Sequence, residues 1–334
     1  MPSQTQTPKY PEFRNWLANP DPSPECLTSL DNETRHSLIE NIIDAIKTYY
    51  LDQAAAETLE TTIHARVSEG LYDHISSGTD LARTITTDLQ TLSGDRHFRC
   101  VFGIPPEEPS RDQQLSRLVK VNYGFGKVEV LDGNIAIVEI TLFPPVDWEG
   151  VREKIHDVMQ SVSGAAALII DLRTCRGGDP KTVALVASYL VKGEASAWLK
   201  MVQPFESVVE ELRGDTLPED SIFSAAKPIY ILTSSTTISG GEDLVYGLQA
   251  RKRALVIGES TAGAANLPRA CVLPGGFVLW VPHKYPVCPV TGKNWEGDGV
   301  VPDIACEEEK AVKRACEMIR KRDQSTGRMN VTEE

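Results

Sequence analysis

No apolar run in the sequence is long enough to cross a bilayer, which argues against a membrane-spanning protein. The first residues are polar and lack the apolar stretch of a secretory signal. The seven cysteines are scattered and form no Cys-x-x-Cys pair. An odd number of isolated thiols is typical of a reduced, intracellular protein, so we expect a cytoplasmic location. We predict no cofactor and no bound metal.

Basic residues are also in short supply. The chain has 34 Lys and Arg against 47 Asp and Glu, a formal net charge of −13, and no stripe of cations. Such a surface repels a phosphate backbone, so we expect no nucleic-acid partner. What is present suits a globular protein: 334 residues, 41% of them hydrophobic, are enough for a sizeable core in two parts.

The hydrophobic pattern divides the chain. Six prolines mark the first residues as extended, and apolar residues at helical spacing then predict three helices packed as a bundle between about Asn32 and Leu92. The Asp132-Gly133-Asn134 turn between two apolar runs predicts a hairpin. The predicted organisation is an extended arm (1–25), a helical N-terminal domain (26–105), an α/β domain (106–322) and a polar tail (323–334).

Helical and strand patterns alternate through the second half, which indicates an α/β fold with functional sites at the carboxyl ends of strands. The predicted helices cover residues 151–162, 181–190, 241–250 and 309–319. The predicted strands cover residues 166–172, 229–232 and 255–257. Three glycine-rich turns follow these strands, at residues 171–178, 239–242 and 258–263. Glycine lets the backbone approach a ligand closely, so the three turns are candidates for one site.

Ser239 is the candidate nucleophile. It directly precedes a predicted helix whose unpaired amides favour a developing oxyanion, and Gly240 leaves room for a carbonyl. The same residues also fit an ordinary capping box, with Glu242 three positions after the serine. Gly177 and Gly178 are candidates for a second oxyanion donor, or else form a tight turn before a helix capped by Asp179.

Three more side chains need an interpretation. Cys175, between two arginines, could be a thiolate, although burial in the core is the more common fate of a free cysteine. His97 lies in a turn that leads into a strand, and it is the candidate base among six histidines. Glu296 lies in an acidic, glycine-rich turn. It could orient the base, or it could serve only the turn.

Taken in order, these segments resemble the tail-specific, or C-terminal-processing, serine proteases. The match is closer to the branch that contains interphotoreceptor retinoid-binding protein modules and relatives of the tricorn core peptidase. The matching segments are Gly94-Asp95-Arg96-His97, residues 122–135, the Asp-Leu-Arg to Gly-Gly turn (171–178), Ser239 to Glu242, the Gly-Glu-x-Thr-x-Gly turn (258–263) and residues 296–303.

The resemblance implies a helical N-terminal bundle plus a ClpP/crotonase-like α/β domain. It also implies Ser239 as nucleophile, the amides of Gly240 and Gly177 or Gly178 as oxyanion hole, His97 as base and Glu296 as orienting acid. The lysine base of the tail-specific proteases proper is missing, because Ala264, Ala265 and Asn266 occupy its place. A Ser–Lys dyad is therefore excluded.

Four departures from the family pattern bear on function. Cys175 replaces an asparagine, and Arg96 is larger than the usual residue before the histidine. Gly240-Gly241 replaces small residues that carry a β-carbon, a change that could enlarge or loosen the pocket. No peptide-tethering PDZ domain is visible, which argues against processive degradation from a captured C-terminus.

Three functions remain open at this point. The chain could hydrolyse peptides, hydrolyse or cyclise a small acyl compound in the same site, or carry a hydrophobic, retinoid-type ligand with vestigial catalytic residues. Intact Ser239, His97 and Glu296 favour an enzyme, and a peptide is the leading substrate. The other partner that we consider is a second copy of the chain, in a homo-oligomer.

Overall fold

The computed structural model describes residues 30–103, 110–191, 197–204 and 208–325. They form two compact units. Of the described residues, the N-terminal unit contains those up to Ser110, those within Val202–Val208, and Asn266–Tyr285; the α/β unit contains the others. The predicted extended arm (1–25) and residues 326–334 of the predicted tail lie outside the described residues. No described helix is both long and apolar enough to span a membrane.

The N-terminal unit begins with the three predicted helices, α1 (Asn32–Tyr49), α2 (Gln53–Ser68) and α3 (Gly78–Ser93). Acidic side chains start two of them, since Asp31 accepts a hydrogen bond from the Thr34 amide at 2.8 Å and Asp52 caps α2 in the same way. The left-handed residue Gly94 (φ 75°) ends α3 and sends the chain into the turn that carries His97.

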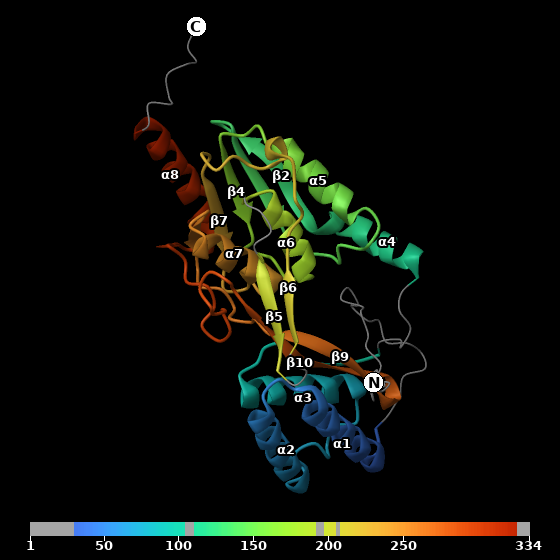
Figure 1. Cartoon of the computed structure of the whole chain (residues 1–334). Helices are drawn as coiled ribbons and strands as arrows, with labels where there is room; N and C mark the ends of the chain where they lie inside the picture. Colours follow the sequence, from blue (N-terminus) through green and yellow to red (C-terminus); the bar gives the residue numbers. More distant parts are fainter. Residues whose placement is uncertain (1–29, 104–109, 192–196, 205–207, 326–334) are drawn as a thin grey trace, which may run out of the picture. The chain divides into compact units, whose positions relative to one another are not determined.

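These helices pack on a sheet in the same unit (Figure 1). Strand β10 (Phe277–Val287) pairs antiparallel with β1 (Arg99–Phe102) and with β9 (Leu267–Leu273). Their shared core includes Cys100, Cys271 and Leu279 from the strands. The sequence pattern did not indicate β9 or β10. Through these strands, part of the second half of the chain belongs to the N-terminal unit. Two further strands, β5 (Leu199–Gln203) and β6 (Val208–Leu212), each contain a point where the chain changes unit.

The α/β unit contains a six-stranded sheet with the order β11-β8-β7-β4-β3-β2. Only β2 runs antiparallel to its neighbour, through the predicted hairpin at residues 132–134. The strands are β2 (Phe125–Leu131), β3 (Ile135–Ile140), β4 (Ala167–Asp171), β7 (Ile229–Thr233), β8 (Leu255–Gly258) and β11 (Ile304–Ala305).

Helices cover both faces of this sheet. The chain moves in one direction from β3 through β4 and β7 to β8, so right-handed crossovers place their connecting helices on one face. Those helices are α5 (Val151–Val162), α6 (Pro180–Ser188) and α7 (Gly240–Ala250). Helix α8 (Ala311–Ser325) packs through Ala311, Ala315 and Ile319 on alternate strand residues of the sheet. A polar helix, α4 (Arg111–Lys120), precedes the sheet.

The topology brings the three glycine-rich turns together. Strands β4, β7 and β8 are parallel neighbours, so the turns that follow them lie side by side at the carboxyl ends of the strands. Hydrogen bonds join the turns directly. The Ile238 amide donates to the Cys175 carbonyl at 3.2 Å, and the Ala262 amide donates to the Thr237 carbonyl at 2.9 Å.

Candidate active site

Ser239 occupies a strained backbone conformation at the start of α7, with φ 56° and ψ −121°. A side chain is rarely found at positive φ, and such outliers concentrate at functional sites. Capping does not require this conformation. The residues that cap the other helices with a side chain are all extended with negative φ: Asp31, Asp52, Ser77 and Asp179. The capping interpretation alone therefore does not account for Ser239.

The capping box is nevertheless present, and its acid does more than cap. The Glu242 carboxylate accepts a hydrogen bond from the Ser239 amide at 2.9 Å. It also accepts from the Thr261 hydroxyl and from the amides of Gly263 and Ala264, the last two at 2.7 and 3.0 Å. Burial raises the pKa of this carboxyl, and the four donors oppose the rise. Glu242 therefore fixes the serine turn to the third glycine-rich turn.

Gly177 and Gly178 have backbone conformations that require glycine, with φ of 82° and 135°. A β-carbon on Gly178 would lie 2.0 Å from the Phe143 carbonyl oxygen, and one on Gly177 would lie 2.7 Å from the Ser239 β-carbon. The amides of Gly178 and Gly240 donate no hydrogen bond to any residue that the structure describes. Two unpaired donors therefore lie beside the serine in the α/β unit, as an oxyanion hole requires.

The structure leaves no open space at the β-carbon positions of Gly240 and Gly241. A β-carbon on Gly240 would lie 3.1 Å from the Gly178 nitrogen, and one on Gly241 would lie 3.1 Å from the Cys175 sulfur. The backbone around Gly178 and the Cys175 side chain occupy the space next to these two positions. Cys175 is buried, and its burial raises the pKa of the thiol to about 12, so the thiolate interpretation is wrong.

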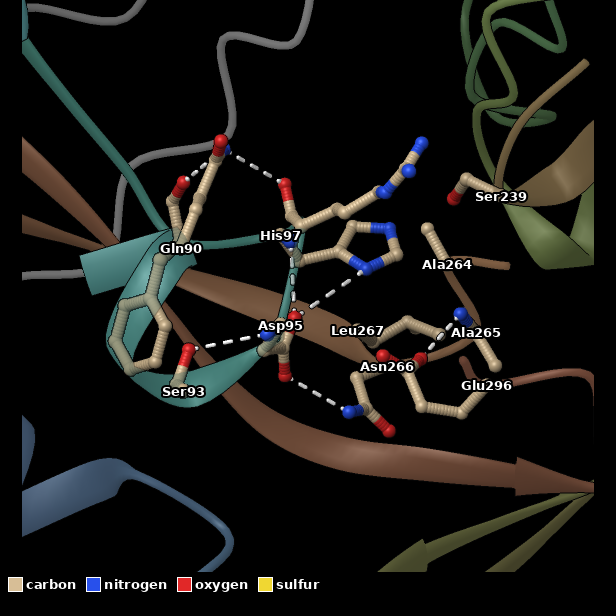
Figure 2. Close-up of polar contacts among 12 residues, drawn as sticks. Gln90, Ser93, Asp95, His97, Ser239, Ala264, Ala265, Asn266, Leu267 and Glu296 are labelled. Atoms are coloured by element: carbon tan, nitrogen blue, oxygen red, sulfur yellow. Dashed lines mark hydrogen bonds and ion pairs between the residues drawn. The ribbon is translucent and has the colours of Figure 1, made fainter. Parts of the chain in front are cut away.

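The acid-rich turn packs on the third glycine-rich turn. The Glu296 carboxylate accepts a hydrogen bond from the Ala265 amide at 2.6 Å (Figure 2). The Trp295 indole donates to the Ala264 carbonyl at 3.0 Å, and the Gly297 amide donates to the Gly263 carbonyl at 2.9 Å. All of these residues belong to the α/β unit.

His97 belongs to the N-terminal unit. Its side chain is 10% exposed, and neither ring nitrogen has a hydrogen-bond partner among the residues that the structure describes. The Asp95 carboxylate lies 3.9 Å from the imidazole Nδ1 (Figure 2). Burial lowers the pKa of the imidazole to about 4, so the ring is neutral at physiological pH and able to accept a proton.

Sequence reasoning gave no role to Asp95 or Asn266, which hold the histidine turn. Buried Asp95 accepts hydrogen bonds from the His97 amide at 2.9 Å and from the Asn266 side chain at 2.8 Å (Figure 2). Burial raises the pKa of Asp95, and these two bonds oppose the rise. The Gly94-Asp95-x-His97 spacing was the signal available for Asp95, since an aspartate two residues before an amide commonly closes an Asx turn.

Asp243, next to Glu242 on α7, yields a prediction about stability. One oxygen accepts a hydrogen bond from the Trp198 indole at 2.9 Å, while the other is buried with no partner in the described part of the chain. Burial raises the pKa of Asp243 from 3.8 to about 7, although the Trp198 bond and the Arg251 charge oppose the rise. The folded protein therefore binds the extra proton between these pH values, and this group makes folding less favourable as the pH rises from about 4 to 7.

Asp243→Asn removes this titration and should stabilise the protein more at pH 8 than at pH 5. We expect the stabilisation to differ by on the order of 2 kcal/mol between the two pH values. Urea unfolding of wild type and variant at both pH values measures the difference. An equal effect of the substitution at pH 5 and pH 8 would contradict the raised pKa.

In chemical terms, the α/β unit combines a strained serine, free amide donors and a buried carboxylate that holds the surrounding turns. The structure brings together Ser239, Gly177, Gly178 and Gly240, and it joins Glu296 to the adjacent turn. His97 lies in the other unit. No group of three His, Cys, Asp or Glu side chains within the described ranges is arranged to hold a metal.

Several solved structures share this fold. A lipoprotein from Streptococcus agalactiae aligns with a TM-score of 0.58 and 14% identity over 86% of this chain and 96% of its own. A peptidase, described as putative, from Parabacteroides merdae aligns with a TM-score of 0.58 and 15% identity over 85% and 96%. The tricorn protease aligns with a TM-score of 0.56 and 12% identity over 86% of this chain and 37% of its own.

Family models cover most of the sequence. The model of peptidase family S41 matches residues 134–306, more than half of the chain. The N-terminal domain of S41 peptidases in eukaryotic IRBP matches residues 30–132. These matches confirm the predicted relationship to the tail-specific protease superfamily, with a helical N-terminal region and a sheet-containing S41 domain. The chain belongs to peptidase family S41.

Proposed function

We propose that this protein is a serine peptidase that cleaves peptide bonds through an acyl-enzyme on Ser239. The observation that carries the proposal is the strained backbone of Ser239 beside the unpaired amides of Gly178 and Gly240. A nucleophile at a sharp strand-to-helix turn presents its hydroxyl at the carboxyl edge of a sheet, next to amide donors. Helix α7 adds the partial positive charge of its N-terminus.

In the proposed reaction the Ser239 oxygen attacks the scissile carbonyl while the His97 imidazole takes its proton. The amides of Gly178 and Gly240, with Gly177 shaping the turn, stabilise the negative charge on the tetrahedral intermediate. The intermediate collapses to the acyl-enzyme, and the imidazolium returns the proton to the leaving amine. Water then enters by the same base catalysis and releases the acid. Glu296 is proposed to orient the base.

Labelling with a fluorophosphonate tests the nucleophile. We expect one equivalent of probe per chain, recovered by peptide mass spectrometry on the peptide that contains Ser239. Ser239→Ala should abolish labelling, whereas Ser235→Ala, an exposed serine of the same turn, should leave it unchanged. Absence of label on a folded wild-type protein would contradict the proposal of a serine enzyme.

A fluorogenic peptide library tests the substrate. Cleavage that is lost in Ser239→Ala supports the peptidase. Labelled protein that cuts no peptide but hydrolyses small esters would keep the nucleophile and transfer the proposal to a small acyl substrate. The two measurements therefore separate the chemistry of the site from its substrate.

A further inference from the structure

A second hollow lies in the α/β unit at the amino ends of the sheet strands, whereas Ser239 lies beyond their carboxyl ends. It has a volume of about 440 Å³ and is lined by the segments that enter β7 and β8. Ser239 and the third glycine-rich turn follow the carboxyl ends of these same strands. The hollow is therefore separate from the candidate active site. We call it the basic groove, after its four cations: Lys227, Lys252, Arg253 and Arg322.

The groove is positive although the whole chain carries a formal net charge of −13. Its cations come from three segments: the entry to β7, the turn after α7, and α8. One carboxylate, Asp303, also lines the groove, and it already accepts a hydrogen bond from the Val256 amide at 2.8 Å. All four cations lie near helix C-termini, since Lys252 and Arg253 follow α7 and Arg322 lies in the last turn of α8. Lys227 donates to the Ser163 carbonyl that caps α5. The partial negative charge of a helix C-terminus, about half a unit, favours such cations without neutralising them.

The charge of Arg253 is held by carbonyl oxygens. Its guanidinium donates to Leu190, Lys227, Phe223 and Ser224 carbonyls at 2.6 to 3.1 Å. Burial lowers the pKa of Arg253, and no acid opposes the change. The carbonyl dipoles solvate the guanidinium, but no carboxylate among the described residues neutralises its positive charge.

Lys227 approaches the same aromatic ring as Arg253. Its ammonium donates to the Ser163 carbonyl at 2.8 Å and lies 5.2 Å from the Phe223 ring centre, while the Arg253 guanidinium lies 5.9 Å from that centre. Among the described residues, no carboxylate approaches Lys227, Lys252 or Arg253 within the 4.0 Å of an ion pair. Like charges gathered in this way repel one another unless an anion lies between them.

The floor of the groove is apolar. Pro228, Ala254 and Leu255 line it, and Leu255 is 43% exposed. The volume falls within the range of small-molecule sites, about 300–1,000 Å³, which combine apolar walls with a few charged groups. We propose that the basic groove binds a small organic phosphate, with the phosphate group among Lys227, Lys252 and Arg322 and the apolar body against Leu255.

Isothermal titration of the full chain with phenyl phosphate tests the proposal. We expect a Kd on the order of 10⁻⁴ M that weakens with added salt. Inorganic phosphate, which lacks the ring, and benzyl alcohol, which lacks the charge, should each bind about tenfold more weakly. Inorganic phosphate that binds as tightly as phenyl phosphate would overturn the role of Leu255. Benzyl alcohol that does so would overturn the anion site.

Variants locate the binding. Lys252→Gln with Arg322→Gln removes two cations at exposed positions and should weaken phenyl phosphate by about tenfold or more. Lys293→Gln with Lys313→Gln removes the same charge at exposed positions outside the groove, and should leave the affinity unchanged. No binding to wild type, or equal losses in the two double variants, would overturn the proposal. The result is independent of peptidase activity, since no variant touches the candidate active site.

Discussion

Replacing His97 with alanine should slow fluorophosphonate labelling of Ser239 by about three orders of magnitude or more. Without a base the serine hydroxyl stays protonated during attack, and general base catalysis contributes about 10² to 10⁴ in rate, more where the residues act as a unit. The measurement is the second-order labelling rate of wild type and His97→Ala. A rate within tenfold of wild type would remove His97 from the proposed mechanism.

The same chain supplies a matched control. His283, in β10 of the N-terminal unit, also has its pKa lowered to about 4, mainly by burial. Its Nδ1 lies 3.1 Å from the Leu267 carbonyl oxygen, and it makes no described hydrogen bond with His97, the catalytic candidate of that unit. His283→Gln should therefore keep the wild-type labelling rate, once thermal unfolding has shown that the variant is folded.

The pH dependence of labelling tests the state of the base. The neutral imidazole accepts the proton, so the rate should rise with pH through the pKa of His97 and then stay constant. Since burial lowers that pKa to about 4, we expect a flat profile between pH 5 and pH 8. A limb centred near the ordinary histidine value of about 6.5 would show that the imidazole titrates as an exposed group.

Local patterns in the sequence predicted most of the fold. The helix predicted at 151–162 has those bounds, and the hairpin lies at the predicted turn. Helix α4 went unpredicted because it buries only Leu118 and so lacks an apolar stripe. Strands β9 and β10 contain prolines, which weakens a strand pattern. Strand β9 pairs with β10, and β10 pairs with β1, far away in the sequence. Pairing over such separations leaves no periodic signal.

The site shows the same division between local and distant information. Ser239 and the glycines beside it could be proposed as site residues from the sequence, because glycines clustered within a few residues mark a turn with positive φ. Three of the four hydrogen bonds of Glu242 come from residues 19 to 22 positions away, and the bond between Asn266 and Asp95 spans 171 positions. Such partners depend on the folded backbone. From the sequence alone Glu242 could be read only as a helix cap.

Glu242→Ala should lower the free energy of unfolding by on the order of 3–5 kcal/mol. The side chain is fully buried and accepts four hydrogen bonds, and its removal leaves those donors without an acceptor. Each buried, unsatisfied donor costs about 1–3 kcal/mol, in part recovered where water enters the cavity. Urea unfolding measures the loss. Glu153→Ala, at an exposed position of α5, serves as the control and should change stability by less than about 1 kcal/mol.

Glu242→Gln separates positioning from stability. Glutamine keeps the volume of the side chain and one acceptor oxygen, but its NH₂ group would face backbone N–H donors. The hydrogen bonds between the serine turn and residues 261–264 are therefore weakened, and no cavity is left. We expect a folded variant that labels at least about tenfold more slowly than wild type, because a small displacement of a nucleophile is costly. If Glu242→Gln labels at the wild-type rate while Glu242→Ala is destabilised, the carboxylate supports the fold alone. A loss of labelling in a stable Glu242→Gln would instead show that the charge on Glu242 holds Ser239 in its strained, reactive conformation.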